Sequence, residues 1–349
     1  MLTFNDGYRT KREEHAETGF RILRAGDVRD GQIQPDGPDF VAGEFAHAIG
    51  EKVARRSDVV LTTKGTVGRV AYVRQLDEPV VYSPQVCYFR SLDVAVLHQP
   101  FLRYWLQSPE FASQSGYLMG ASDMAPYISL RDLASATITL PDAAAQEAIA
   151  EVLGALDDKI AANTSLSTRA VELADQLFVG ARKSAATHVT SFNEVATVGG
   201  GGTPSTRVPE YWDGEIPWVT PTDITALGSP YLDRTARRIT EAGFAKCSSA
   251  LHSVDSILMT SRATIGAFAL AKVPVAVNQG FIVALAKDQA AQLWLFHEMR
   301  CRVDDFLAHA NGATFLELSK SKFKALEVLW PDQNDTFERF RRPVRSLHD

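Results

Sequence analysis

Short apolar runs, bounded by Gly, Pro, Asn or Ser, recur along the chain and predict β-strands. They are rich in Val, Ile, Thr and aromatic residues and lie at 58–63, 67–73 and 80–89, and again at 256–260, 265–271 and 275–285. After each set we expect a helix and a closing strand, at 99–108 and 135–140 in the first case and at 289–307 and 325–330 in the second. The pattern therefore predicts two mixed domains in which β-structure dominates.

The two sets of predicted strands resemble each other in sequence. Residues 61–68 (LTTKGTVG) align with 259–266 (MTSRATIG), and the positions that differ are close in size or charge. Four further matches keep the same order along the chain: Asp27-Val28 with Asp223-Ile224, Gln85 with Gln279, Gly120-Ala121-Ser122 with Gly312-Ala313-Thr314, and Pro141-Asp142 with Pro331-Asp332. The offset between the copies drifts by a few residues, as small insertions and deletions in a duplicated domain produce. The sequence therefore predicts a tandem repeat of one domain.

A different pattern separates the two copies. Residues 143–182 contain no proline, and apolar or small residues recur there at alternating spacings of four and three: Ile149, Leu153, Leu156, Ile160, Asn163, Ser167, Ala170, Ala174 and Leu177. A helix of this length reaches about 60 Å at 1.5 Å per residue, so we expect it to pack against another long helix. Its candidate partner-binding residues are Ile149, Leu153, Leu156, Ile160 and Leu177, and a solvated linker helix is the alternative.

Together these patterns give an α+β chain with four parts. A first β-rich domain covers 1–141, a long coiled-coil-type helix covers 142–185, a second β-rich domain covers 186–331, and a short tail covers 332–349. The chain of 349 residues is long enough for two domains and connecting structure.

Composition narrows the class of protein. With 45% hydrophobic and 22% charged residues the chain is a folded protein without an apolar run long enough for a membrane helix, and we expect a cytoplasmic location. The net charge of −6 argues mildly against indiscriminate coating of nucleic acid. The three cysteines are too far apart for a zinc site, and no histidine motif for a metal, Walker motif or adenine-methylation motif is present, so we expect no cofactor, no metal and no catalytic residue.

Several sequence motifs resemble those of the specificity subunit of type I DNA restriction-modification systems. They are Gly200-Gly201-Gly202-Thr203-Pro204-Ser205-Thr206 with 211–219 (YWDGEIPWV), residues 260–266 (TSRATIG), Asn278-Gln279-Gly280-Phe281, and Pro141-Asp142 followed by Gln146-Glu147-Ala148-Ile149 and Leu156-Asp157-Asp158-Lys159-Ile160. The likeness extends over nearly the whole chain.

The resemblance implies two target-recognition domains, related by a pseudo-twofold axis, that each recognise one half of a bipartite double-stranded DNA sequence. It implies two long antiparallel helices as a spacer, which also dock adenine methyltransferase subunits, and an assembled complex that recruits ATP-dependent restriction subunits. The specificity subunit itself is not catalytic. Here the tail after Asp332 is short and Pro343 interrupts it. We therefore expect either a chain truncated at both ends or a missing helix that is supplied by a partner or a second copy.

Polar and basic loops are the candidate DNA contacts. Thr203, Ser205, Thr206 and Arg207 follow the glycine stretch at 199–202, which lacks the lysine of a phosphate-binding loop. The candidates in the first copy are Tyr8, Arg9, Lys11, Arg12, Lys64 and Ser122, and those in the second copy also include Arg262, Thr314, Lys320 and Lys322.

For several of these residues a structural role is an equal alternative. Lys64 and Arg262 are equivalent and either bind phosphate or pair with groups inside the fold. Lys320, Lys322 and Lys324 alternate, so a strand would place them on one face, against either DNA or solvent. For Gln85 and Gln279 we favour a structural role.

Two functions remain open at this stage. The first is a non-catalytic specificity subunit that recognises bipartite DNA. The alternative is a solitary or degenerate specificity subunit that acts as a protein-interaction module and exchanges with, or blocks, a complete one.

Overall fold

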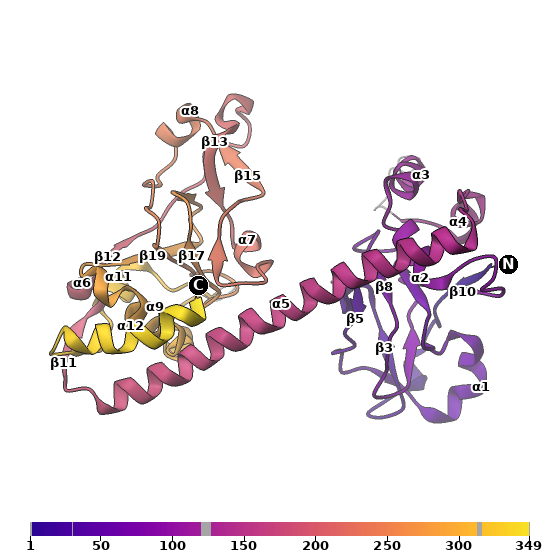
Figure 1. Ribbon diagram of the computed structural model, residues 1–349, viewed down its shortest axis with the longest axis horizontal. Coiled ribbons are helices and arrows are strands. Elements are labelled where there is room, and N and C mark those ends of the chain that lie inside the picture. The colour runs from indigo at the N-terminus through magenta and orange to yellow at the C-terminus, as the bar shows by residue number, and fades with distance from the viewer. Residues whose placement is uncertain (1, 30, 120–126, 313–315, 349) are drawn as a thin grey trace. The chain divides into compact units, whose positions relative to one another are not determined.

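The computed structural model describes residues 2–29, 31–119, 127–312 and 316–348 (Figure 1). The chain divides into two compact units, Met1–Lys159 and Ile160–Asp349, and the boundary falls inside one helix. Each unit combines helices with sheets whose strands are mostly antiparallel, as the α+β prediction requires. The domain limits at 141, 185 and 331 stay predictions.

The main sheet of unit 1 has the strand order β1-β10-β7-β8, and all its neighbours are antiparallel. The strands are β1 (Leu2–Asp6), β10 (Val86–Ser91), β7 (Val59–Thr62) and β8 (Val70–Tyr72). A smaller sheet contains β2 (His15–Ala16), β6 (Phe40–Val41), β3 (Phe20–Leu23) and β9 (Val80–Tyr82), and β4 (Val28–Arg29) pairs with β5 (Gln32–Ile33). The longer helices are α2 (Gln99–Trp105), α3 (Pro109–Met119) and α4 (Leu130–Ser135).

The main sheet of unit 2 has the order β12-β19-β16-β17-β14. Its strands are β12 (Ala196–Gly199), β19 (Phe281–Ala286), β16 (Ile257–Thr260), β17 (Phe268–Ala271) and β14 (Tyr231–Leu232). A second sheet contains β15 (Arg237–Ile239), β13 (Trp212–Val219) and β18 (Ala276–Val277), and β11 (Thr187–Ser191) pairs with β20 (Glu327–Pro331). The helices are α6 (Phe192–Val195), α7 (Pro221–Thr225), α8 (Glu241–Ala245), α9 (Gln292–Arg300), α10 (Val303–Ala308), α11 (Lys320–Ala325) and α12 (Asp335–His348).

The central turn of the repeat has the same geometry in both units. The Thr62 hydroxyl donates to the carbonyl of Thr66 at 2.5 Å, and the Thr260 hydroxyl donates to the carbonyl of Thr264 at the same distance. Gly68 and Gly266 follow with φ of 92° and 91°, values that favour glycine. The matched sequence at 61–68 and 259–266 therefore encodes one hairpin twice.

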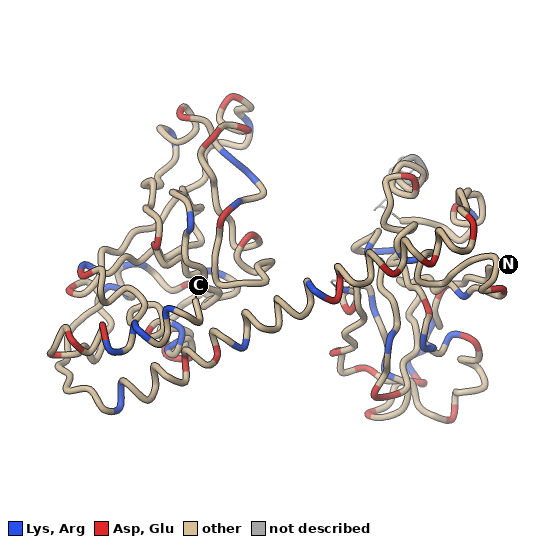
Figure 2. Tube along the Cα trace, in the orientation of Figure 1, with Lys and Arg blue, Asp and Glu red and all other residues tan. Residues whose placement is uncertain are grey.

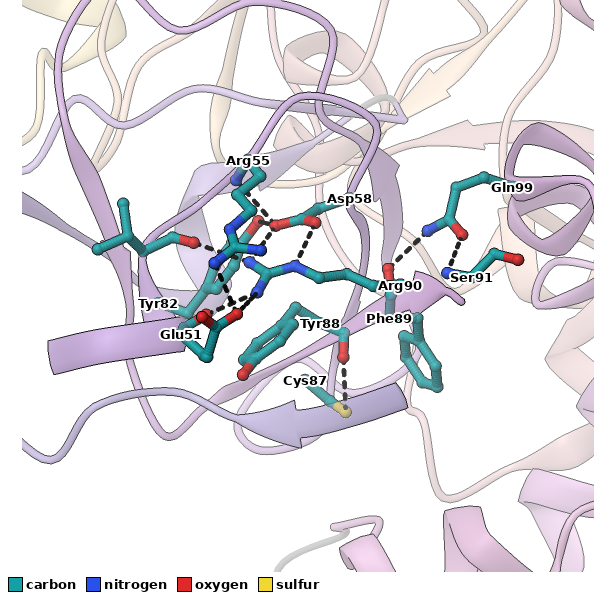
Figure 3. Close-up of polar contacts among 11 residues, drawn as sticks. Glu51, Arg55, Asp58, Tyr82, Cys87, Tyr88, Phe89, Arg90, Ser91 and Gln99 are labelled. Carbon is teal, nitrogen blue, oxygen red and sulfur yellow. Dashed lines mark hydrogen bonds and ion pairs between the residues drawn. The ribbon is translucent and has the colours of Figure 1, made fainter. Parts of the chain in front are cut away.

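One buried ion-pair network distinguishes the first copy from the second. Asp58 is 2% exposed and accepts hydrogen bonds from the Tyr82 hydroxyl at 2.7 Å and from the Arg90 guanidinium at 2.7 and 2.8 Å (Figure 3). Burial raises the pKa of Tyr82 well above its usual value, and the neighbouring carboxylate raises it further. The strand alignments place Ser256, Val277 and Leu285 at the equivalent positions in unit 2.

The long helix α5 extends over Ala143–Ser184, which confirms the predicted helix between the copies. In unit 2 its side chains at Val171, Ala174 and Phe178 are buried in the core. Phe178 packs edge to face against Phe340 of α12, with ring centroids 5.6 Å apart. Helix α12 continues through Pro343, so the expected interruption of the tail is wrong.

Several local predictions differ from the structure. Residues 136–142 form no strand, because the backbone N–H groups of Thr137 and Thr139 bind the side chains of Gln114 and Glu110 in α3. The run at 80–89 is split into β9 and β10, and the helix at 289–307 is split into a short 3-10 turn, α9 and α10. Lys320, Lys322 and Lys324 lie on helix α11, not on a strand, because Ser319 caps the helix by accepting from the N–H of Lys322.

Candidate nucleic-acid interface

In unit 2, several loops meet at one end of the main sheet. Strand β12 ends there at Gly199, β16 ends there at Thr260, and β19 begins there at Phe281, because these three neighbouring strands are antiparallel. The N–H of Ser261 donates to the carbonyl of Gly280 at 2.8 Å, and the N–H of Leu318 donates to the carbonyl of Ser261 at 3.0 Å. The glycine-rich loop, the repeat turn and the segment before α11 are therefore neighbours.

Unit 1 has the same arrangement at the corresponding end of its sheet. The N–H of Thr63 donates to the carbonyl of Gln85 at 2.8 Å, and the N–H of Ile128 donates to the carbonyl of Thr63 at 3.0 Å. The N–H of Tyr8 donates to the carbonyl of Tyr82 at 2.6 Å. We call these two equivalent regions the loop ends of the units.

A glycine in each loop end is required by close packing. A Cβ atom on Gly7 would lie 2.1 Å from the carbonyl oxygen of Tyr82, and one on Gly201 would lie 1.8 Å from that of Val277. Such distances are impossible for any other residue without moving the backbone. The glycine stretch is thus a close approach of two chain segments, in agreement with the rejection of a phosphate-binding loop.

The predicted contacts of unit 1 lie at its loop end. Arg9, Lys11, Arg12 and Lys64 are exposed, and none has an acidic side chain within ion-pair distance among the residues that the structure describes. Tyr8 differs, since its hydroxyl donates to the buried carboxylate of Glu14 at 2.9 Å. Burial and this hydrogen bond raise the pKa of Tyr8. Tyr8 therefore supports the loop, while the four cations are available to a ligand.

The loop end of unit 2 contains polar side chains and one pre-formed contact between them. Ser205, Thr206 and Arg207 are exposed, and the Thr203 hydroxyl donates to the Oε1 atom of Gln279 at 2.5 Å. The structural role that we favoured for glutamine holds for Gln85, whose Oε1 accepts from the N–H of Ala25.

The sequence alignment of Gln279 with Gln85 is wrong by one residue. Gly280, not Gln279, supplies the carbonyl that is equivalent to that of Gln85. Gln279 is exposed, whereas Gln85 is half-buried. An exposed amide beside a hydroxyl is suited to base edges, and its signal in the sequence was hidden by the shifted alignment.

The three remaining candidate cations of unit 2 have different environments. Arg262 is ion-paired with Glu317 at 2.8 Å, so part of its charge is compensated inside the fold. The Lys322 ammonium donates to the carbonyl of His309 at 3.0 Å. The Lys320 side chain lies over Gly200, with its ammonium exposed beside the glycine-rich loop.

One neighbouring side chain was not a candidate. His252 contacts the carbonyl of Gly200 at 3.2 Å, and burial together with the Lys320 charge lowers its pKa. It is a satisfied polar residue that supports the loop. Ser122 and Thr314 lie outside the described residues.

The candidate partner-binding residues lie on α5. Ile149, Leu153, Leu156, Ile160 and Leu177 are all exposed, and Ile160 is 64% exposed. Val152 is exposed beside the first three and was not predicted. Apolar side chains at this spacing on a solvent-facing helix are typical of a surface that binds another helix.

Charged residues of both signs are distributed over the two units (Figure 2). Within the described parts of the chain, no cluster of three or more His, Cys, Asp or Glu side chains is placed to hold a metal ion. In the same residues no helix combines the length and the apolarity needed to cross a membrane.

Comparison with known proteins places this architecture in a family. The model of the type I restriction modification DNA specificity domain matches residues 1–170 and 187–336, once for each copy of the repeat. The chain therefore belongs to the type I restriction-modification DNA specificity family.

Two curated relatives are similar over part of the chain. The specificity subunit of type I restriction enzyme MjaIX from Methanocaldococcus jannaschii is 37% identical over 149 residues, which are 42% of this chain and 34% of that protein. The EcoR124I/EcoR124II specificity subunit from Escherichia coli is 28% identical over 152 residues, 42% of this chain and 37% of that protein. The matched segments thus span little more than a third of these relatives.

A solved structure, the S subunit of a type I restriction-modification system from M. genitalium, aligns with 99% of this chain and 90% of its own. The TM-score is 0.49 and the sequence identity is 13%.

Proposed function

We propose that this chain is the non-catalytic subunit that gives a type I restriction-modification complex its DNA sequence specificity. Each unit recognises one half of a bipartite double-stranded site through its loop end. The observation that carries the proposal is the duplicated loop end, with exposed cations at Arg9, Lys11, Arg12 and Lys64 in one copy and exposed Thr203, Gln279 and Lys320 in the other.

Within this function the candidate residues have two kinds of role. Cations such as Lys64 and Lys320 bind phosphates and so position the duplex. Gln279, with its oxygen held by Thr203, presents its amide group to base edges. Sequence specificity then depends on the loops, which differ between the copies, while the hairpins that carry them are the same.

The exposed apolar residues of α5 support docking of other subunits. Adenine methyltransferase subunits bind along this helix and flip the target adenine out of the duplex. ATP-dependent restriction subunits join the assembled complex in the cytoplasm, and a partner or a second copy of the chain covers the part of α5 near Ile149 and Ile160.

Methylation mapping tests this function. The chain is co-expressed with a type I methyltransferase subunit from the same source, and methylated adenines are mapped with and without the chain. We expect methylation at one bipartite motif only when the chain is present. Thr203→Val and Gln279→Ala should relax the second half of the motif and leave the first half unchanged.

Two results contradict the proposal. A methylation pattern that does not depend on the chain would remove its role in specificity. If the chain instead lowers methylation by a complete specificity subunit in the same cell, the interaction-module function, in which it exchanges with or blocks that subunit, is the correct one.

A further inference from the structure

Two buried glutamines show which positions of helices α2 and α9 are equivalent in the two units. Gln99 is the first residue of α2, and its side chain accepts from the N–H of Ser91 and donates to the carbonyl of Phe89, both at 2.6 Å. Gln292 is the first residue of α9, and its side chain accepts from the N–H of Ala286 at 2.7 Å. Tyr104 and His297 therefore occupy the same position in the two helices.

Both of these residues bind an aspartate of α5. In unit 1, the Tyr104 hydroxyl donates to Asp157 at 2.9 Å, and Arg103 forms an ion pair with the same carboxylate at 2.6 Å. Arg103 is 7% exposed. Burial and the bond to Asp157 raise the pKa of Tyr104 to about 12, so the hydroxyl stays protonated and remains a donor.

Unit 2 repeats the arrangement with different donors. His297 contacts Asp175 at 2.6 Å through Nδ1, and Arg300 forms an ion pair with the same carboxylate at 2.9 Å. Burial alone would raise the pKa of Asp175, but the bonds from His297 and Arg300 hold it below its usual value. We call these two contacts the aspartate clasps of α5.

The rest of the contact with α5 differs between the units. In unit 1, Gln146 donates to the carbonyls of Val96 and Pro141, and Ala150 is the buried apolar residue of this part of the helix. In unit 2 the helix is held by buried Val171, Ala174 and Phe178. The position of α5 on unit 1 therefore depends more on its clasp than the position on unit 2 does.

We propose that Asp157 and Asp175 are positioning residues that fix the rotation of α5 about its own axis on each recognition unit, and so restrict the spacer length between the two DNA half-sites. The inference rests on the proposed function. A shift of one residue along a helix turns it by about 100° and moves it by about 1.5 Å. A full shift would turn the buried face of α5 away from the unit, so a loosened clasp permits only smaller changes in rotation and axial position, below the ~3.4 Å rise of one base pair. Such changes weaken the preference for the cognate spacer length over a neighbouring one.

The test compares Asp157→Asn, Asp175→Asn and the control Asp158→Asn. Asn keeps the size of the side chain but weakens the bonds to the cationic partner. The control residue lies next to the clasp and pairs with Arg74 at 2.7 Å, with both side chains more than half exposed. Each full-length variant is co-expressed with the methyltransferase subunit, and methylation is mapped at motifs with the cognate spacer and with one base pair more or fewer.

We expect the preference of the wild type for its cognate spacer to fall about tenfold in Asp157→Asn, less in Asp175→Asn, and not at all in Asp158→Asn. The bases recognised in each half should not change. Tyr104→Phe, which removes only a hydroxyl, should give an intermediate loss of the spacer preference. It tests the clasp independently if the aspartate variant does not fold.

An unchanged spacer preference in Asp157→Asn and Tyr104→Phe, together with a lower melting temperature, would overturn the inference and leave the clasps as stabilising contacts. Failure of the proposed function is distinct, because the wild type would then give no bipartite motif.

Discussion

Phe178 of the long helix and Phe340 of the C-terminal helix pack edge to face, and both rings also contact Trp294 of α9. Phe178 is fully buried. This aromatic cluster joins α5 and α12 to the core of unit 2, although Phe178 and Phe340 lie far apart in the sequence. It is therefore the main apolar anchor of the long helix.

Replacement of Phe178 by Ala should lower the free energy of unfolding by about 3–5 kcal/mol, because it removes a buried ring and leaves a cavity. Leu166→Ala is the matched control, since Leu166 lies on the same helix and is 68% exposed. Urea denaturation of both variants measures the difference. Equal stability of the two variants would show that the cluster does not anchor α5.

The Asp58 network should behave as a buried ion pair. Asp58→Ser removes the buried carboxylate that pairs with Arg90 and leaves only the exposed carboxylate of Glu51, at 3.2 Å, so we expect a loss of about 3 kcal/mol. The double variant Asp58→Ser with Arg90→Leu, which introduces the residues found at the equivalent positions of unit 2, should recover at least about 1 kcal/mol of this. Urea denaturation of these two variants and of Arg90→Leu alone gives the coupling energy. No recovery would mean that the cost comes from lost packing.

The C-terminal helix should loosen in acid. His348 contacts His297 at 3.0 Å and the Tyr231 hydroxyl at 2.6 Å, and burial together with the His297 and Arg300 charges lowers the pKa of His348 to about 4. The unfolded chain binds this proton more readily than the folded chain. The stabilising contribution is therefore complete above pH ~6.5 and is lost as the pH falls toward 4.

We expect the free energy of unfolding to be about 2 kcal/mol lower at pH 5 than at pH 7.5. Thermal unfolding across this range measures the effect, and His348→Gln should remove most of it. His47→Gln, at an exposed position, serves as the control. A pH dependence that survives in His348→Gln would assign it to other groups.

The cations of the loop ends should determine the salt dependence of DNA binding. Lys64→Gln and Lys320→Gln should each reduce the slope of log K against log salt by about 1, because each removes one phosphate contact. Arg262→Gln should change the slope less, since Glu317 already compensates its charge. Lys287→Gln is the control, because Lys287 follows the opposite end of β19.

Binding isotherms of the full complex on one duplex, at several salt concentrations, measure these slopes. The same slope in Lys64→Gln, Lys320→Gln and Lys287→Gln would mean that the loop ends do not contact the backbone of the DNA.

The sequence by itself determined the features that rest on local interactions. Thr62 and Thr260 hydrogen-bond within their own turns, so the matched motifs predicted both hairpins. The proline-free pattern predicted α5, because helical hydrogen bonds connect residues four apart. Composition and motifs also pointed to binding rather than catalysis.

Only the tertiary structure decided what depends on distant partners. The alternation at 135–140 packs against the core but forms no strand, since side chains of α3 bind its N–H groups, whereas β20 pairs with β11 in the second copy. The lysines at 320–324 follow a serine cap and are helical. Asp175 meets His297 across 122 residues of sequence, and no local pattern encodes a contact that exists only after both helices pack into the same core.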